Sequence, residues 1–146
     1  MRYTTSTDGI GFENLTGFFV DWPNPPSPQM HLEILKDSYA IALAVEDARV
    51  VGFANAISDG RLAAYIPLLE VLPTYRNRGV GSQLIKMMLA QLEGLYMIDL
   101  RCDEHLEPFY ERLGFSGWAG SERTVGMGIR DYRRQSGTRK HDIGRR

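Results

Sequence analysis

One stretch decides the fold: Leu69-Glu70-Val71-Leu72-Pro73-Thr74-Tyr75-Arg76-Asn77-Arg78-Gly79-Val80-Gly81-Ser82. A strand-like apolar run ends near Val71, and a helical pattern begins near Gly79. The first turn of a helix has N–H groups without intrahelical partners and the positive end of the helix dipole, so it attracts anions. Arg76 and Arg78 add positive charge beside it. The stretch therefore predicts a site for a pyrophosphate or a similar anion.

The glycine pattern excludes two common phosphate-binding loops. A Walker-type loop ends in Gly-Lys followed by Ser or Thr, and this chain has no such sequence. A dinucleotide fingerprint needs a third glycine three residues after Gly81, where Leu84 stands. A Gly-x-Gly without further context favours an ordinary helix start over a ligand site.

Periodicity predicts the elements around this turn. Helical spacing continues to Glu93, where Gly94 is a stop signal. Pro67 removes a ladder donor, so an irregularity is expected in its strand. The predicted strands are Tyr39–Val45, Arg49–Ile57, Leu62–Val71, Leu95–Arg101, Phe115–Trp118 and Arg123–Ile129, and the other predicted helices are Ile10–Val20, Pro28–Leu35 and Leu106–Leu113. This order indicates an α/β fold with helices packed on a mixed sheet.

Length and composition are typical of one soluble globular domain. The chain has 146 residues and is 43% hydrophobic, and its longest apolar run, Tyr39–Val45, is too short to span a bilayer. The residues after Met1 do not form a signal peptide. Cys102 is the single cysteine, so no internal disulfide can form, and we expect a cytoplasmic protein without membrane association.

The end of the chain differs in charge from the rest. The whole chain has a formal net charge of −1. From Arg130 onward there are seven Lys or Arg residues and two Asp. We expect one domain over residues 1–130 and a flexible, solvated tail over 131–146. A tail that binds phosphate or nucleic acid is the alternative, but no aromatic residues repeat there to support a nucleic acid partner.

Two motifs together resemble the GNAT superfamily of acetyl-CoA-dependent N-acetyltransferases. The segment Val71-Leu72-Pro73-Thr74-Tyr75-Arg76-Asn77-Arg78-Gly79-Val80-Gly81 is similar to its coenzyme A motif. Downstream, Phe109-Tyr110-Glu111-Arg112-Leu113-Gly114-Phe115 resembles its Phe-Tyr-Glu-x-x-Gly-Phe pattern. One helix and one strand separate the motifs, and the resemblance spans Tyr39 to Trp118. It implies a GNAT-like, mostly antiparallel sheet of six to seven strands flanked by about four helices.

The resemblance also implies where acetyl-CoA binds. The backbone of Leu69 and Val71 would pair with the pantetheine arm, in a gap between the third and fourth predicted strands. A backbone N–H near Glu70 or Val71 would polarise the acetyl carbonyl. The pyrophosphate would be held by the amides and charges of Arg76, Asn77, Arg78, Gly79, Val80, Gly81 and Ser82.

The implied general acid is Tyr110, which would protonate the departing thiolate; a purely structural aromatic is the alternative. Two carboxylates are candidates for the general base. Asp99 lies where ribosomal-protein acetyltransferases that resemble this chain have a glutamate, and Glu70 ends the cofactor strand. Surface roles for both carboxylates, and a water chain as the base, stay open. Pro67 and Leu68 replace acidic residues of the glucosamine-phosphate acetyltransferases that the chain also resembles.

The remaining candidates do not indicate further chemistry. His31, His105 and His141 match no metal spacing, so no metal is expected. Cys102 is expected to pack as a small apolar side chain. Trp22 lies in the region that in this family covers the acceptor pocket, and it either lines that pocket or anchors its loop.

The predicted function is therefore direct transfer of an acetyl group from acetyl-CoA to a primary amine of an unidentified small molecule or peptide. A non-catalytic coenzyme A-binding or sensor module on the same fold is the alternative. The resemblance is also compatible with a homodimer.

Overall fold

The computed structural model describes residues 1–118 and 124–137. Within these residues the strands form one seven-stranded sheet in the order β1-β2-β3-β4-β5-β7-β6. Neighbouring strands run antiparallel, except that β4 and β5 run parallel. The strands are β1 (Arg2–Thr4), β2 (Ala40–Glu46), β3 (Arg49–Ser58), β4 (Ala63–Val71), β5 (Met97–Asp103), β6 (Ser116–Trp118) and β7 (Thr124–Arg130). The predicted mixed, mostly antiparallel sheet is confirmed.

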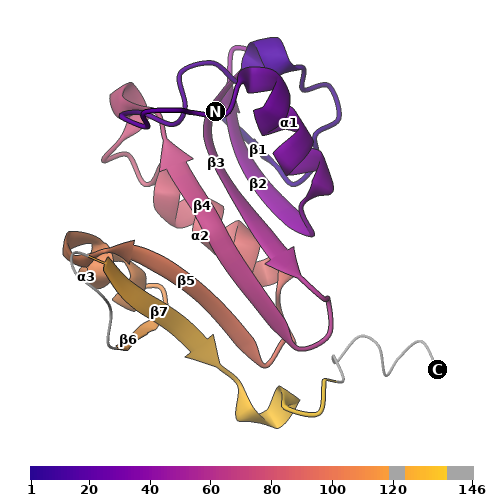
Figure 1. The fold of residues 1–146 in the computed structure, drawn as a ribbon, viewed down its shortest axis with the longest axis vertical. Coiled ribbons are helices and arrows are strands. Elements are labelled where there is room, and N and C mark those ends of the chain that lie inside the picture. The colour runs from indigo at the N-terminus through magenta and orange to yellow at the C-terminus, as the bar shows by residue number, and fades with distance from the viewer. Residues whose placement is uncertain (119–123, 138–146) are drawn as a thin grey trace.

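Three α-helices in the described residues cover the two faces of the sheet (Figure 1). They are α1 (Pro28–Asp37), α2 (Val80–Gln91) and α3 (Glu107–Glu111), one fewer than the four predicted. Leu35 of α1 belongs to the core on one face of the sheet, together with residues that precede α1 in the chain. Leu84 of α2 and Tyr110 of α3 belong to the core on the other face. None of these helices combines the length and the apolar character needed to cross a bilayer.

Strand β2 shows how the sheet separates the two cores. Ala42 and Ala44 belong to the core with α2 and α3, whereas Ile41, Leu43 and Val45 belong to the core with α1. Alternate residues of a strand point to opposite faces, so a run that is apolar on both faces is buried on both sides. This accounts for the continuous apolar sequence of β2.

The prediction of a helix over Ile10–Val20 is wrong. The structure has only a 3-10 turn at Phe12–Asn14, followed by left-handed backbone at Gly17 (φ 93°) and Phe19 (φ 62°). Left-handed residues interrupt a right-handed helix. Strand β1 was not predicted, because three residues are too few to show a period.

The irregularity predicted at Pro67 is present. Between β3 and β4, Asn55 pairs with Leu68 and Ile57 pairs with Tyr65, so β4 has one more residue than β3 across this interval. An extra residue of this kind bends the strand and increases its twist. Figure 1 shows β4 and β5 diverging beyond this point.

The predicted tail is described only in part. Residues 131–137 include a 3-10 turn at Tyr132–Arg134, in which the Arg133 N–H donates to Asp131 Oδ1 at 3.2 Å. The Tyr132 ring lies 5.6 Å from that of Tyr96. The remainder of the predicted tail, residues 138–146, lies outside the described residues.

His31 of α1 is a buried histidine within an aromatic cluster. Its side chain is 1% exposed, and its ring centroid lies 4.3 Å from that of Phe53, 4.9 Å from that of Phe19 and 5.4 Å from that of Phe18. Neither ring nitrogen has a hydrogen-bond partner among the described residues. Burial lowers the pKa of His31 to about 4, because the charged imidazolium is poorly solvated there.

We therefore expect stability to fall in mild acid. Unfolded His31 has a pKa of about 6.5. The contribution of His31 to the free energy of unfolding is thus complete above pH 6.5 and is lost as the pH falls to 4. The reason is that the unfolded chain binds the proton at a higher pH than the folded chain does. The loss amounts to about 3 kcal/mol at 1.36 kcal/mol per pKa unit. Urea unfolding of wild type and His31→Leu from pH 7 to 4 measures it. A difference between the two proteins that does not change with pH would contradict the assignment.

Candidate functional site

The site begins where β4 and β5 part. Ala63–Ile66 of β4 pair with Met97–Leu100 of β5, whereas β5 continues to pair with β7 as far as Asp103. The last residues of β4, from Leu68 to Val71, therefore pair only with β3. This leaves one edge of β4 available to an extended ligand.

The backbone groups on that edge follow from the strand register. Leu72 N–H donates to the Val51 carbonyl at 2.9 Å, so the amide of Leu72 faces β3. Because amides alternate along a strand, Glu70 also faces β3, whereas Leu69 and Val71 face the gap. The two residues predicted to pair with a pantetheine arm are therefore those whose N–H groups point into the gap. Of Glu70 and Val71, only Val71 presents its N–H there.

A second set of donors lies at the start of α2. Gly79 precedes the helix with φ 80°, and no side chain caps the first turn. The left-handed backbone explains the need for glycine, since a Cβ would be strained there although no atom lies within 4 Å of its position. The first N–H groups of the helix, from Val80 to Ser82, therefore have no intrahelical partner.

The two arginines of the turn have different surroundings. Arg76 Nε donates to the Val71 carbonyl at 3.0 Å, which brings its side chain back over the end of β4. The Arg78 guanidinium lies 5.3 Å from the centroid of the Tyr75 ring, and Arg78 does not line the cavity described below. Arg76 is thus the arginine closer to a ligand at the turn.

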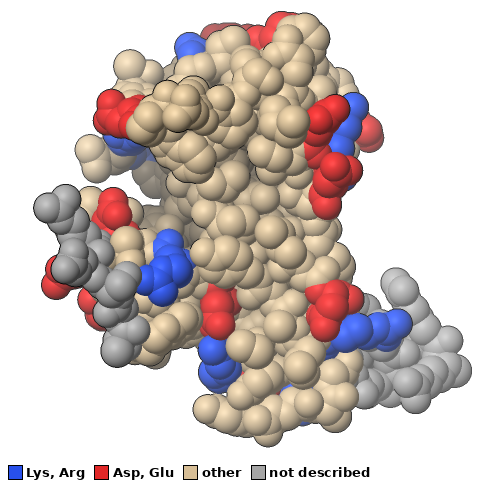
Figure 2. Space-filling model, in the orientation of Figure 1, with Lys and Arg blue, Asp and Glu red and all other residues tan. Residues whose placement is uncertain are grey.

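Two adjoining cavities occupy the gap, and both are lined by Leu69, Arg76, Leu106 and Tyr110. The first, about 400 Å³, is named the cofactor-side cavity after the sequence-based expectation, and it is also lined by Val71, Tyr75, Asn77, Gly79, Val80, Gly81, Ser82 and Phe109. The second, about 440 Å³, is named the acceptor-side cavity on the same basis, and it is also lined by Phe19, Val20, Asp21, Trp22, Phe53, Ile66, Pro67, Leu68, Glu70, Arg101, Cys102, Asp103 and Thr124. In Figure 2 a notch indents the surface of the molecule between the part that contains the end of β4 and the part that contains the end of β5. The face shown has basic and acidic residues interspersed.

Tyr110 lies where the two cavities meet. The residue is 5% exposed, and its ring packs edge-on against Phe109 at 4.9 Å and Phe115 at 5.8 Å between centroids. Burial raises the pKa of Tyr110 well above that of an ordinary tyrosine, because the phenolate would be poorly solvated. The hydroxyl is thus kept protonated and next to both cavities.

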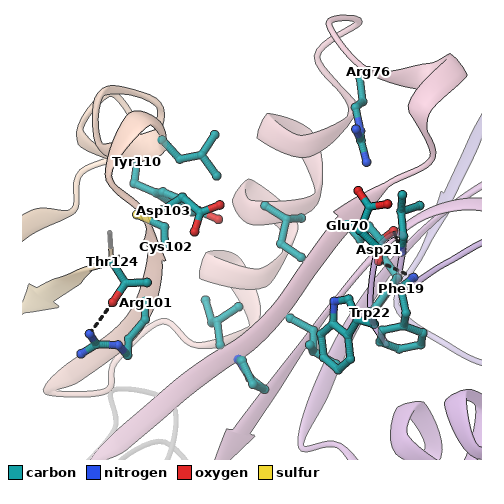
Figure 3. A pocket seen from close by; sticks show the side chains of 17 residues that line it. Phe19, Asp21, Trp22, Glu70, Arg76, Arg101, Cys102, Asp103, Tyr110 and Thr124 are labelled. Carbon is teal, nitrogen blue, oxygen red and sulfur yellow. Dashed lines mark hydrogen bonds between the residues drawn. The ribbon is translucent and has the colours of Figure 1, made fainter. Parts of the chain in front are cut away.

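The two candidate bases are placed differently. Glu70 lines the acceptor-side cavity, and its carboxylate accepts hydrogen bonds from the Phe19 and Val20 N–H groups (Figure 3). Asp99 lies in the paired part of β5 and does not line either cavity. Its carboxylate forms a bidentate ion pair with Arg130, whose pKa is raised chiefly by this hydrogen bonding. The structure thus brings Glu70 and Tyr110 to one cavity and leaves Asp99 outside it.

Several lining residues were not predicted. Asp21 forms part of the wall opposite Cys102 and Asp103 (Figure 3), and Phe53 also lines this cavity. Nothing in the sequence distinguished Asp21 and Phe53 from other loop or core residues. Trp22, whose role was left open, lines the cavity, and its ring lies 5.0 Å from that of Phe19 in the same segment.

Cys102 packs as a small buried side chain, as predicted. Cys102 is 8% exposed and packs in the core, and burial raises the pKa of its thiol. His105 is exposed in the turn before α3. The described part of the chain has no group of three His, Cys, Asp or Glu side chains placed to hold a metal ion.

Solved structures share this fold. A protein from Deinococcus radiodurans R1 described as an acetyltransferase is 42% identical, with a TM-score of 0.79 over 94% of this chain and 92% of its own. An aminoglycoside 6'-N-acetyltransferase solved with coenzyme A is 17% identical, with a TM-score of 0.68 over 89% of this chain and 97% of its own. The second likeness shows the fold alone.

Sequence comparison agrees. The histone acetyltransferase TAP1 of Glycine max is 31% identical over 121 residues, which is 74% of this chain but 51% of that protein. The GCN5-related N-acetyltransferase 3 of Arabidopsis thaliana is 33% identical over 78 residues, 52% of this chain and 33% of that protein. This chain thus spans about half of the first relative and a third of the second. The family model for the acetyltransferase (GNAT) domain matches residues 13–133, and the chain therefore belongs to the GNAT acetyltransferase family.

Proposed function

We propose that the protein transfers an acetyl group from acetyl-CoA directly to a primary amine of a small molecule or peptide. One observation carries this proposal: the free edge of β4, the uncapped start of α2 and Tyr110 all line two adjoining cavities. The donor and the acceptor would enter from opposite sides and meet at Tyr110. Coenzyme A in structural neighbours of the same fold supports the choice of donor.

The cofactor-side residues fit coenzyme A by their chemistry. The N–H groups of Val80, Gly81 and Ser82 at the start of α2 would bind the pyrophosphate, with charge from Arg76. The Val71 N–H and the free edge of β4 beside it would hold the pantetheine arm as an added strand, which leaves the Leu69 N–H for the acetyl group. Asn77 and Gly79 shape the turn through left-handed backbone, at φ 62° and 80°.

The residues at the junction would then assist the transfer. The Leu69 N–H, which faces the gap where the two cavities meet, would polarise the acetyl carbonyl, and the amine nitrogen would form its bond to the carbonyl carbon. As the carbon–sulfur bond breaks, Tyr110 gives its phenolic proton to the leaving sulfur and regains one from water. The proton lost by the amine passes to water in the open acceptor-side cavity. The products are an amide and free coenzyme A.

A pair of substitutions at Gly81 tests the donor site. A Cβ there would lie 3.5 Å from the nearest Phe109 atom, which is ordinary contact, so Gly81→Ala should fold and bind normally. Gly81→Leu should instead fill the cofactor-side cavity and weaken coenzyme A binding at least tenfold, equivalent to about 1.4 kcal/mol. Titration calorimetry with coenzyme A measures both. Equal affinity in the two variants would overturn the donor site.

Acetyl transfer is tested separately with a panel of primary amines and detection of the released thiol. Cys102 is buried and contributes at most one background thiol per chain. New thiol should form only when an acceptable amine is present. Tight coenzyme A binding without transfer to any amine in a broad panel would favour the non-catalytic binding module instead.

A further inference from the structure

The segment Phe19–Trp22 forms one wall of the acceptor-side cavity, and all four of its residues line it. Its backbone is unusual, because Phe19 has φ 62° and Asp21 has φ 66°. Residues with a side chain rarely adopt left-handed backbone, and bulky ones such as Phe do so least of all. Such a conformation persists only where surrounding contacts hold it.

Glu70 supplies the hydrogen bonds that hold this segment. The Phe19 N–H donates to Glu70 Oε1 at 2.8 Å, and the Val20 N–H donates to Glu70 Oε2 at 3.3 Å. Figure 3 shows Glu70 reaching from β4 toward Phe19 and Asp21, on the side of the cavity opposite Tyr110. Both carboxylate oxygens are therefore engaged by the backbone of a segment about 50 residues earlier in the chain.

Aromatic packing completes the arrangement. The Phe19 side chain is 5% exposed, and its centroid lies 6.0 Å from that of Phe53 on β3. Trp22 packs against Phe19 but is itself 48% exposed, so its ring reports on the segment without being part of the core. Removal of the hydrogen bonds to Glu70 would thus release a segment whose residues do not by themselves favour left-handed backbone.

We propose that Glu70 is a positioning residue that holds Phe19–Trp22 in place and thereby determines which amines enter the acceptor-side cavity. This inference rests on the proposed function for the identity of the cavity as an acceptor site. It differs from the expectation that Glu70 is the general base, since a base must turn a free oxygen toward the amine.

The two roles predict different behaviour for two substitutions. Glu70→Ala removes both hydrogen bonds and the carboxylate. Glu70→Gln removes the charge and the basic oxygen but keeps one carbonyl oxygen able to accept from an N–H group. A positioning role therefore predicts partial rescue by glutamine, whereas a base role predicts equal loss in both variants.

The first measurement is fluorescence and needs no turnover. In a Trp118→Phe background, Trp22 is the only tryptophan in the chain. Acrylamide quenching of Trp22 should be greater in Glu70→Ala than in the parent, with Glu70→Gln intermediate. Glu33→Ala on the exposed side of α1 serves as the matched control and should leave quenching unchanged. Quenching that is the same in all Glu70 variants would overturn the proposal, whether or not any amine is acetylated.

The second measurement is steady-state kinetics with an amine accepted by wild type. Glu70→Ala should raise the KM for the amine about tenfold, as expected for lost hydrogen bonds to a charged group, and change the KM for acetyl-CoA less than about twofold. Glu70→Gln should raise the amine KM less, with the wild-type pH profile of kcat. Equal loss of kcat in both variants, with the acidic limb of the profile abolished, would establish the base role and overturn the positioning role.

Discussion

Replacement of Tyr110 by phenylalanine is expected to lower kcat about a hundredfold, at the lower end of the range for general acid catalysis. The substitution removes one hydroxyl and keeps the ring that packs against Phe109 and Phe115. The KM for acetyl-CoA should change less than about twofold, because the cofactor-side donors are backbone groups that the substitution does not alter. Initial rates over a range of acetyl-CoA concentrations measure both constants.

Tyr132→Phe is the matched control, since Tyr132 is 68% exposed and outside both cavities. Because burial raises the pKa of Tyr110, the phenol should also keep its proton up to and beyond the usual tyrosine pKa of about 10. An alkaline loss of activity in wild type that disappears in Tyr110→Phe would contradict this. A kcat in Tyr110→Phe equal to that of wild type would refute the acid role.

Replacement of Phe53 by alanine is expected to lower the free energy of unfolding by about 3–5 kcal/mol. Phe53 is fully buried, and its ring lies between His31 at 4.3 Å and Phe18 at 5.0 Å. The truncation leaves a cavity where α1 and the Phe19–Trp22 segment pack on β3, so both the transfer of apolar surface and the lost packing contribute.

Phe53→Leu is the matched control, because it keeps most of the volume and should cost less than alanine does. Urea unfolding followed by circular dichroism gives both values, provided that the slope with urea is the same as for wild type. Since Phe53 also lines the acceptor-side cavity, the alanine variant should bind its amine less selectively as well. A loss below about 1 kcal/mol would show that the cluster repacks and that Phe53 does not support this wall.

Local patterns predicted most elements correctly, and the helix that they predicted wrongly shows their limit. Helix α2 and its Gly79 turn were predicted because strand, turn and helix signals follow one another within fourteen residues. In the span of the helix predicted over Ile10–Val20, Phe19 has left-handed backbone, and its N–H donates to Glu70, about 50 residues away. A propensity summed over neighbouring residues contains no information on such a contact.

The candidate bases show the same limit. Asp99 and Glu70 were equivalent in the sequence, since each is a carboxylate near the end of a strand beside the cofactor motif. In the structure, Asp99 pairs with Arg130 in the closed part of the sheet, whereas Glu70 lies past the point where β4 and β5 separate. Only the position of that separation distinguishes them.

The backbone groups of the proposed donor side could therefore be located from the amino-acid sequence, and the walls of the acceptor-side cavity could not. Backbone amides at one strand edge and one helix start make up the donor side, and a short contiguous sequence specifies both. The acceptor side combines Phe19–Trp22, Phe53, Glu70 and residues from Arg101 to Asp103, which only chain packing brings together. Its shape depends on hydrogen bonds and aromatic contacts between distant segments, and these form only when the whole sheet and both cores are in place.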